Sequence, residues 1–178
     1  MSWSFALPQA VFASPILSTA TPLAGGMLTG YLVNRGGTTK AKYGSIRQPP
    51  FRPPTWLFPA VWTLLYPLMG YAAHHASMTG LSAATFSPEL RDLTKKSQTL
   101  YTVQLVFNYL WMPLFFGLRR PDLALADLVA IGGNVAGLLH LWWQIDRTAF
   151  WMLVPYASWV GFAMYLNIGV GWLNNWRI

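Results

Sequence analysis

Aromatic and amide side chains recur at helical spacing inside the apolar stretches of this 178-residue sequence, and they are the groups best suited to contact a ligand. Trp62 precedes Tyr66 by four residues, so a helix presents both rings on one face. Gln104, Asn108 and Trp111 also fall on one helical face, as a polar and aromatic stripe. Flat aromatic walls beside hydrogen-bonding amides suit a flat, apolar ligand.

A third candidate wall lies near the carboxyl terminus, where Pro155, Trp159, Ala163 and Leu166 share one helical face. The tryptophans that lie deepest within apolar stretches are the pocket candidates, namely Trp62, Trp111 and Trp159. The others lie near predicted helix ends, where an indole typically anchors at the membrane interface: Trp3, Trp56, Trp142, Trp143, Trp151, Trp172 and Trp176.

The polar groups inside the apolar stretches leave two interpretations open. Each amide either bonds a neighbouring helix or contacts a ligand; they are Gln104, Asn108, Asn134 and Asn167. Asp127 is the one acid inside a predicted span and therefore a functional candidate. Its position one turn into a helix, beside Arg119 and Arg120, favours a structural role in which the bases and the helix dipole stabilise it.

Several kinds of chemistry have little or no support. The sequence has no cysteine, which excludes disulfides, thiolate metal sites and cysteine nucleophiles. No tight cluster of histidines and acids predicts a metal site, and no cofactor is expected. The histidines, His74, His75 and His140, are scattered near helix ends, so haem ligation and a proton relay have weak support.

The elements that must position these residues are transmembrane helices. Of the residues, 54% are hydrophobic and 10% are charged, whereas soluble domains are about a quarter charged. Five charge-free stretches are long enough to cross a bilayer of about 30 Å. The predicted fold is an all-α integral membrane protein, one domain over residues 1–178, whose five transmembrane helices lie near 7–33, 56–78, 97–118, 123–144 and 148–172.

Basic residues indicate the orientation and argue against nucleic-acid binding. The net charge is +7, but the bases lie in short loops rather than on a helix face. One side carries eight of them, Arg35, Lys40, Lys42, Arg47, Arg52, Arg119, Arg120 and Arg177, and the other side four, Arg91, Lys95, Lys96 and Arg147. The positive-inside rule therefore predicts that loop one, between the first two helices, and the carboxyl terminus are cytosolic.

Prolines and small residues predict how the helices pack. Four of the five predicted helices contain proline, and repeated kinks favour an internal space, although prolines are also simply commoner in transmembrane helices. Three pairs of small residues allow close helix approach, namely Gly26 with Gly30, Gly133 with Gly137, and Ala157 with Gly161. We expect most of them to serve packing inside the bundle, and a dimer interface stays open for one.

Four sequence strings together resemble the translocator protein family, also called tryptophan-rich sensory proteins or peripheral benzodiazepine receptors. The first runs from Pro53 to Tyr71 and contains Pro-Pro-x-Trp, Val-Trp-Thr-x-Leu-Tyr and Met-Gly-Tyr. The second, from Gln104 to Gly117, reads Gln-x-x-x-Asn-x-x-Trp-x-Pro-x-Phe-Phe-Gly. Ala-Leu-Ala-Asp at 124–127 and Val-Pro-Tyr-x-x-Trp-Val-x-Phe-Ala-x-x-Leu-Asn at 154–167 complete the match.

The resemblance implies a five-helix bundle, often dimeric, that binds tetrapyrroles such as protoporphyrin IX and, in animals, cholesterol and benzodiazepine-type ligands. The family pocket opens near loop one. Its contacts carry over to Gly30, Val33, Phe58, Pro59, Val61, Trp62, Tyr66, Asn108, Ala126, Ala130, Trp159, Ala163 and Leu166. The implied location is the mitochondrial outer membrane in a eukaryote, with the endoplasmic reticulum or a bacterial membrane as alternatives, and the implied partners are lipid, a porphyrin or sterol-like molecule, and a second copy.

Two departures from the family concern ligand preference. Animal members carry a cholesterol-recognition motif with a tyrosine and an arginine at the end of helix five, and both side chains are missing from residues 166–172 here. An aromatic residue that precedes Ala-Leu-Ala-Asp in some members is Leu123 here.

The sequence leaves three functions to be distinguished. The first is a membrane protein that binds tetrapyrroles or other flat hydrophobes and acts in porphyrin or lipid transport, sensing or stress regulation. The second is an enzyme for light- and oxygen-dependent protoporphyrin degradation, proposed for some family members, in which Trp62 and Trp159 would take part; the sequence supplies no general base, metal or redox site for it. A transporter is disfavoured because there is no duplicated half and no midplane charge.

Overall fold

The computed structural model describes residues 5–37, 39–82 and 87–178, and this part of the chain is all-helical. Its α-helices, in chain order, are α1 (Gln9–Ala13), α2 (Pro15–Asn34), α3 (Thr39–Ser45), α4 (Leu57–Leu81), α5 (Pro88–Met112), α6 (Pro121–Ile145) and α7 (Arg147–Leu173). A π-helical turn, η1 (Pro113–Gly117), follows α5 directly.

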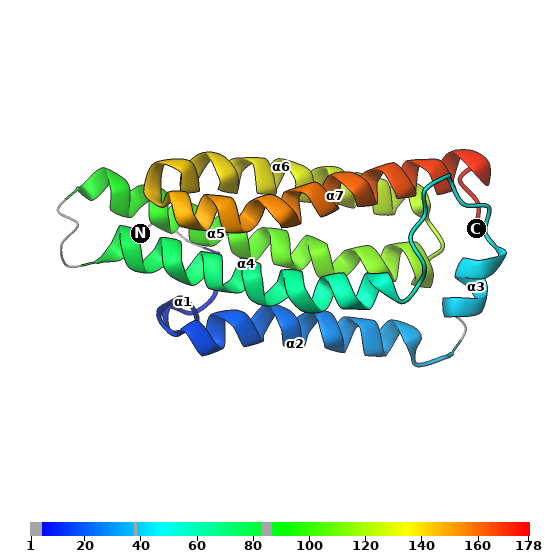
Figure 1. The fold of residues 1–178 in the computed structure, drawn as a ribbon, viewed down its shortest axis with the longest axis horizontal. Helices are drawn as coiled ribbons and strands as arrows, with labels where there is room; N and C mark the ends of the chain where they lie inside the picture. The colour runs from blue at the N-terminus through cyan, green and yellow to red at the C-terminus, as the bar shows by residue number, and fades with distance from the viewer. Residues whose placement is uncertain (1–4, 38, 83–86) are drawn as a thin grey trace.

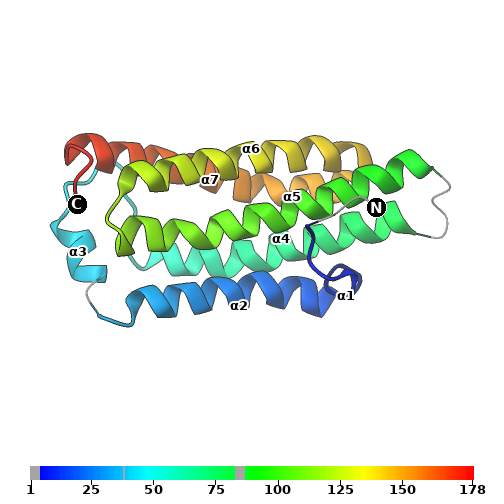
Figure 2. The same cartoon turned by 180° about the vertical axis from the view of Figure 1, so that it is seen from behind.

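The long helices run side by side along the long axis of the molecule (Figures 1 and 2); they are α2, α4, α5, α6 and α7. Neighbours along the chain pack together as α5 with α6 and α6 with α7, while α2 lies against α4, and α4 against α7. The short helix α3 lies at the end of the bundle where the carboxyl terminus also lies (Figure 1). Loop one thus contains a helix that the sequence analysis did not predict.

Within the described residues, three helices are long and apolar enough to cross a membrane by length and composition, namely α2, α6 and α7. Helices α4 and α5 are each 25 residues long, and α5 begins with a charged segment that makes it less apolar over its length. The predicted count of five helices is not confirmed, because the described residues form seven α-helices, two of them short.

Local chemistry explains where the helices depart from their predicted bounds. Residue Ser14 is extended and divides the first predicted helix into α1 and α2, because a residue before proline disfavours the α conformation. The Ser14 hydroxyl accepts a hydrogen bond from Leu17 N at 3.3 Å and so caps α2. Helix α5 begins at Pro88 rather than at Ser97, since Ser87 caps it in the same way and its first turns are polar.

A second departure occurs at the end of α5, where the expected α-helix changes to the π-helical η1. Pro113 cannot donate a backbone hydrogen bond, and the Leu118 amide bonds Pro113 O at 2.9 Å, five residues back. The remaining helices, α4, α6 and α7, each extend slightly beyond their predicted limits. The wider turn at η1 re-aims Phe115 and Phe116 next to Trp111.

The core of the bundle is formed by apolar faces of α4, α5, α6 and α7. A small-residue face of α4, with Met69, Ala72 and Ala76 buried, lets the neighbouring helices approach closely. Trp142 was predicted to lie at the membrane interface but is only 1% exposed, and its ring lies 6.5 Å from that of Tyr101. That prediction was wrong because the α6 face carrying Trp142 turns toward α5. Trp3 lies outside the described residues.

Helices α2 and α4 meet at a proline and a glycine. Pro22 has no amide hydrogen, so it leaves Ser18 O without its usual partner four residues later in α2. A Cβ at Gly70 would overlap Ser18 O, which means that the α4 backbone approaches this carbonyl directly. The carbonyl that Pro22 leaves without its helical partner is therefore approached by a glycine of the neighbouring helix.

Candidate ligand-binding cavity

A cavity of about 580 Å³ lies between α2, α4, α5 and α7, with α3 at one end. This volume falls in the range of pockets that bind drug-sized molecules. Its lining is mainly apolar and aromatic, with a few amides and hydroxyls, and includes Leu23, Gly26, Met27 and Gly30 of α2, Phe58, Pro59, Trp62 and Tyr66 of α4, Asn108, Tyr109 and Trp111 of α5, and Trp159, Ala163 and Leu166 of α7.

Aromatic rings from α4 and α7 form one continuous wall of the cavity. Trp62 lies beside Tyr66, with ring centroids 4.9 Å apart and planes inclined by 30°. Phe58, one turn earlier on α4, has its centroid 6.0 Å from that of Trp159 on α7. The predicted sharing of a face by Trp62 and Tyr66 is thus observed, and Trp62 and Trp159 line the same cavity from different helices.

Buried hydrogen bonds hold three of the lining helices together behind this wall. The Tyr66 hydroxyl donates to Asn108 Oδ1 at 2.7 Å, and Asn108 Nδ2 donates to the Tyr156 hydroxyl at 3.1 Å. Tyr156 in turn donates to Gln104 Oε1 at 2.7 Å. Gln104 therefore bonds between helices, while Asn108 does so and also lines the cavity. Buried networks of this kind rigidify a site through the bonds they make, and in this one Gln104 Nε2 has no hydrogen-bond partner among the described residues.

Two other amides have different partners. Asn167 joins helices, because its Nδ2 donates to Pro121 O at 2.8 Å and its Oδ1 accepts from Trp111 Nε1 at 3.3 Å. Asn134 instead bonds Ala130 O in its own helix at 2.9 Å, so the structure shows no interhelical bond for it. Asn167, like Asn108, also lines the cavity, so contact of either amide with a ligand stays a prediction.

Asp127 lacks the basic partners that were predicted for it. The Arg120 guanidinium pairs with Asp122 at 2.6 Å, because that carboxylate is only two residues away. Asp127 is 6% exposed, and its Oδ2 has no hydrogen-bond partner among the described residues. Its stabilisation by Arg119 and Arg120 is thus not observed.

Glycines of α2 make room for tyrosine rings at the cavity. A Cβ at Gly26 would overlap the Tyr66 ring, and one at Gly25 would lie 2.5 Å from Tyr109 Cζ. The Gly26 and Gly30 pair was predicted to bring two backbones together, but Gly26 accommodates a side chain and Gly30 has no atom within 4 Å of an added Cβ. The carboxyl half of α2 therefore borders open space.

Loop one closes the α3 end of the cavity. The Tyr43 ring of α3 contacts Phe58 and Phe116, with centroids 6.0 and 6.1 Å apart. Burial raises the pKa of Tyr43 above its ordinary value, and the nearby charge of Arg52 only partly opposes this, so the hydroxyl is neutral at physiological pH. The exposed bases of loop one are Arg35, Arg47 and Arg52, whereas the side chains of Lys40 and Lys42 lie outside the described residues.

Most of the site residues expected from the family resemblance line the cavity: Gly30, Phe58, Pro59, Trp62, Tyr66, Asn108, Trp159, Ala163 and Leu166. Four do not. Val33 lies in the last turn of α2, where its carbonyl accepts from Thr39 Oγ1, and Val61 packs into the core beside the cavity. Ala126 and Ala130 lie on the face of α6 opposite the buried Leu128 and Ile131.

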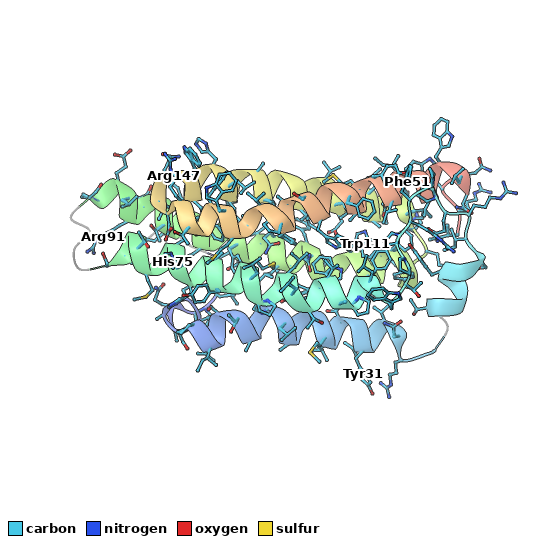
Figure 3. All side chains as sticks on the ribbon, in the orientation of Figure 1. Tyr31, Phe51, His75, Arg91, Trp111 and Arg147 are labelled. Carbon is cyan, nitrogen blue, oxygen red and sulfur yellow. The ribbon has the colours of Figure 1, made fainter. Side chains whose placement is uncertain are left out.

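Sequence reasoning missed other lining residues. Phe115 continues the spacing of Gln104, Asn108 and Trp111 by one more turn, so extending that stripe would have found it. Tyr43 carries no such signal, because it comes from a loop whose helix was not predicted. Figure 3 shows Trp111 toward the α3 end of the bundle and Tyr31 pointing outward from α2, whereas His75 and Arg147 lie at the opposite end.

These features define an all-helical integral membrane protein with a cavity inside the bundle. The family model described as the TspO/MBR family matches residues 18–173. The chain therefore belongs to this family, which confirms the resemblance seen in its sequence strings.

Individual relatives agree with this assignment. The chain is 40% identical over 145 residues to the Translocator protein homolog of Schizosaccharomyces pombe, covering 82% of this chain and 85% of that protein. It is 36% identical over 160 residues to the Translocator protein of Bos taurus, covering 88% and 87%. The Tryptophan-rich sensory protein of Cereibacter sphaeroides is 34% identical over 132 residues, covering 74% and 76%.

Proposed function

We propose that this protein binds a flat, amphipathic tetrapyrrole of the protoporphyrin IX type in the cavity between α2, α4, α5 and α7. The proposal rests on one observation: Trp62, Tyr66 and Trp159 line a cavity of about 580 Å³. Apolar aromatic walls bind a flat macrocycle by burying its faces. Such binding would serve porphyrin or lipid transport, sensing or stress regulation.

The proposed ligand lies with its carboxylates toward loop one. The cavity reaches α3 at that end, where the exposed Arg35, Arg47 and Arg52 provide cations. Guanidinium groups form strong, charge-assisted hydrogen bonds with carboxylates. The interior end holds neutral groups, since the Tyr66 hydroxyl donates to Asn108 there.

In the membrane, we propose that α2, α4, α5, α6 and α7 all cross the bilayer as a five-helix bundle. Helices α4 and α5 are 25 residues long and lie alongside the three more apolar helices. A 25-residue helix spans about 37 Å, enough for a bilayer core. Loop one and the carboxyl terminus are then cytosolic, and the membrane is the mitochondrial outer membrane in a eukaryotic host.

Tryptophan fluorescence tests this proposal directly. Purified protein titrated with protoporphyrin IX, haem and cholesterol should show saturable quenching by the porphyrin, and Trp62→Ala with Trp159→Ala should reduce it. Trp151, 63% exposed outside the cavity, offers the matched control variant Trp151→Ala. Unchanged porphyrin affinity in both cavity variants, with retained fold, would show that the ligand does not bind in this cavity.

A second candidate function is light- and oxygen-dependent degradation of bound protoporphyrin. The observation in its favour is that Trp62 and Trp159 both line the cavity, where an excited porphyrin would contact oxidisable indoles. Product analysis after illumination separates the two functions. Catalysis requires several turnovers for each protein molecule, whereas a stoichiometric or light-independent loss of porphyrin supports binding alone.

A further inference from the structure

A second cavity lies on the other side of α7, as a groove of about 200 Å³ between α6 and α7. Its lining is small and apolar, with Gly132, Ala136 and Leu139 from α6 and Ala157, Gly161 and Met164 from α7. The groove exists because the glycines and alanines leave space that larger side chains would fill. An added Cβ at Gly161 meets no atom within 4 Å, so this space is open at Gly161.

The groove faces the surroundings of the bundle rather than its interior. Ala136 and Gly161 are exposed, and both helices are apolar enough to span a membrane. In a bilayer, an apolar gap on such a surface contacts either acyl chains or another helix. Val160 separates the groove from the cavity described above, which it also lines.

A pair of aromatic rings lies beyond the groove, toward the turn between α6 and α7. Trp143 continues the helical stripe of Gly132, Ala136 and Leu139, at intervals of four, three and four residues. Its ring lies against that of Phe150 of α7, with centroids 4.9 Å apart. On α6, this aromatic pair begins one turn beyond Leu139, the groove residue nearest to the turn.

Arg147 places a cation beside this aromatic pair. The Arg147 guanidinium carbon is 3.5 Å from the centroid of the Trp143 ring, so stacking holds the charge in place. Arg147 makes no ion pair within the described residues, and the neighbouring Asp146 is engaged by His75 and Thr79 instead. The cation is therefore positioned but not neutralised.

The distance from Arg147 to the groove residues matches the distance from a phospholipid headgroup to its acyl chain. Because Arg147 begins α7 directly after the span α6, it lies near a membrane surface. At 1.5 Å per residue, the groove residues lie roughly 10–25 Å below it along the two helices. A lipid phosphate lies about 20 Å from the midplane of a bilayer, so one acyl chain reaches along the groove.

We propose that this groove is a binding site for an anionic phospholipid, with the headgroup at Arg147 and Trp143 and one acyl chain between α6 and α7. Charge complementarity decides between occupants, since a sterol or an uncharged lipid gains little from a fixed guanidinium. The aromatic pair places the boundary between headgroup and chain at the interface, where indoles are typically found.

Native mass spectrometry tests the proposal. The full chain is equilibrated with equimolar phosphatidylglycerol and phosphatidylcholine that carry identical oleoyl chains, and the bound lipid is counted. The wild type should retain phosphatidylglycerol preferentially. Arg147→Gln should lower that retention about fivefold, to the level of phosphatidylcholine, which corresponds to one surface cation. The matched charge control is Lys95→Gln, at another exposed base of the same end of the bundle.

Filling the groove provides an independent readout. Gly161→Leu should abolish retention of both lipids, whereas Gly133→Leu, on an exposed face outside the groove, should behave as wild type. Ala136→Leu serves if Gly161→Leu fails to fold. Equal retention of the two lipids by wild type, an equal loss in Lys95→Gln, or unchanged retention in the filled variants would each refute the proposal. Conversion of a dimer to a monomer by Gly161→Leu, without lipid loss, would identify the groove as a subunit interface instead.

Discussion

The side chain of Asn174 holds the backbone of Arg47 in loop one through two hydrogen bonds. Its Oδ1 accepts from Arg47 N at 3.1 Å, and its Nδ2 donates to Arg47 O at 2.8 Å. Three residues later, Pro50 O accepts from the Tyr165 hydroxyl of α7 at 2.9 Å. The end of α7 therefore anchors the loop whose helix α3 closes the ligand cavity.

Replacing Asn174 should loosen loop one without unfolding the bundle. Asn174→Ala loses both bonds, and each exposed bond contributes about 1 kcal/mol at most, so porphyrin affinity should fall by less than about thirtyfold. Asn174→Asp keeps the Oδ1 acceptor for Arg47 N but replaces the Nδ2 donor with an oxygen that repels Arg47 O, so it should also loosen the loop. Hydrogen exchange would show the change as faster exchange at Arg47, and equal exchange in all three proteins would contradict the anchoring role.

Removing the aromatic wall should weaken porphyrin binding. Trp159→Ala deletes a stacking surface and should cost about 1–3 kcal/mol of binding free energy, as aromatic hot spots do. Trp159→Phe keeps a ring beside Phe58 and should have a modest effect. Fluorescence titration measures both, and an alanine variant as tight as the phenylalanine variant would show that stacking is unimportant here.

The buried tyrosine network should contribute to stability. Tyr156→Phe leaves Gln104 Oε1 and Asn108 Nδ2 without their shared partner, and an unsatisfied buried polar group costs about 1–3 kcal/mol. The thermal unfolding midpoint in detergent should therefore fall. The matched control is Tyr31→Phe on the exposed face of α2, which should leave the midpoint unchanged. Equal midpoints for the two variants would show that the network adds no stability.

Asp146 should make the unfolding free energy depend on pH. Burial acts to raise the pKa of this carboxyl, but hydrogen bonds from Thr79, His75 and Ala149 N outweigh it, and the pKa lies below its ordinary value. Its contribution is therefore fully present above an unfolded-state pKa of about 4, and is lost as pH falls through the lower folded pKa.

The variant Asp146→Asn tests this. It should lower the unfolding free energy near neutral pH and flatten its decline below about pH 4, because the titrating group is gone. The comparison variant is Asp122→Asn. Asp122 belongs to an exposed ion pair at the other end of α6, and such a carboxylate contributes little to the unfolding free energy. If the unfolding free energy of Asp146→Asn declines at acid pH as steeply as that of the wild type, other carboxylates cause the decline.

Orientation in the membrane can be tested at Gly44 of α3. This residue is exposed, and an added Cβ there meets no atom within 4 Å, so Gly44→Cys introduces a thiol into a chain that has none. With loop one in the cytosol, an impermeant maleimide should label it from the cytosolic side. Labelling only from the opposite side would reverse the proposed topology.

Much of the site was predictable because helical periodicity is a local property. Absence of charge over long stretches indicated the long helices, and the spacing of Trp62 with Tyr66 placed both rings on one face before any packing was known. Where a motif lies on one regular helix, its side chains point in directions set by 3.6 residues per turn. Asn108, Trp111 and Trp159 were therefore recognised as candidates for the cavity.

Other features depend on which face each helix turns toward its neighbours, and sequence periodicity does not specify that. Trp142 is buried against Tyr101 although it lies near a helix end, and Ala126 points away from the cavity although its family equivalent was expected there. Tyr43 reaches the cavity only because loop one folds back and is held at Arg47 by Asn174, 127 residues away in the chain. The sequence by itself thus determined the apolar helices and the faces of their aromatic residues, whereas tertiary packing decided which of those faces enclose the cavity, because helix rotation depends on contacts between distant segments.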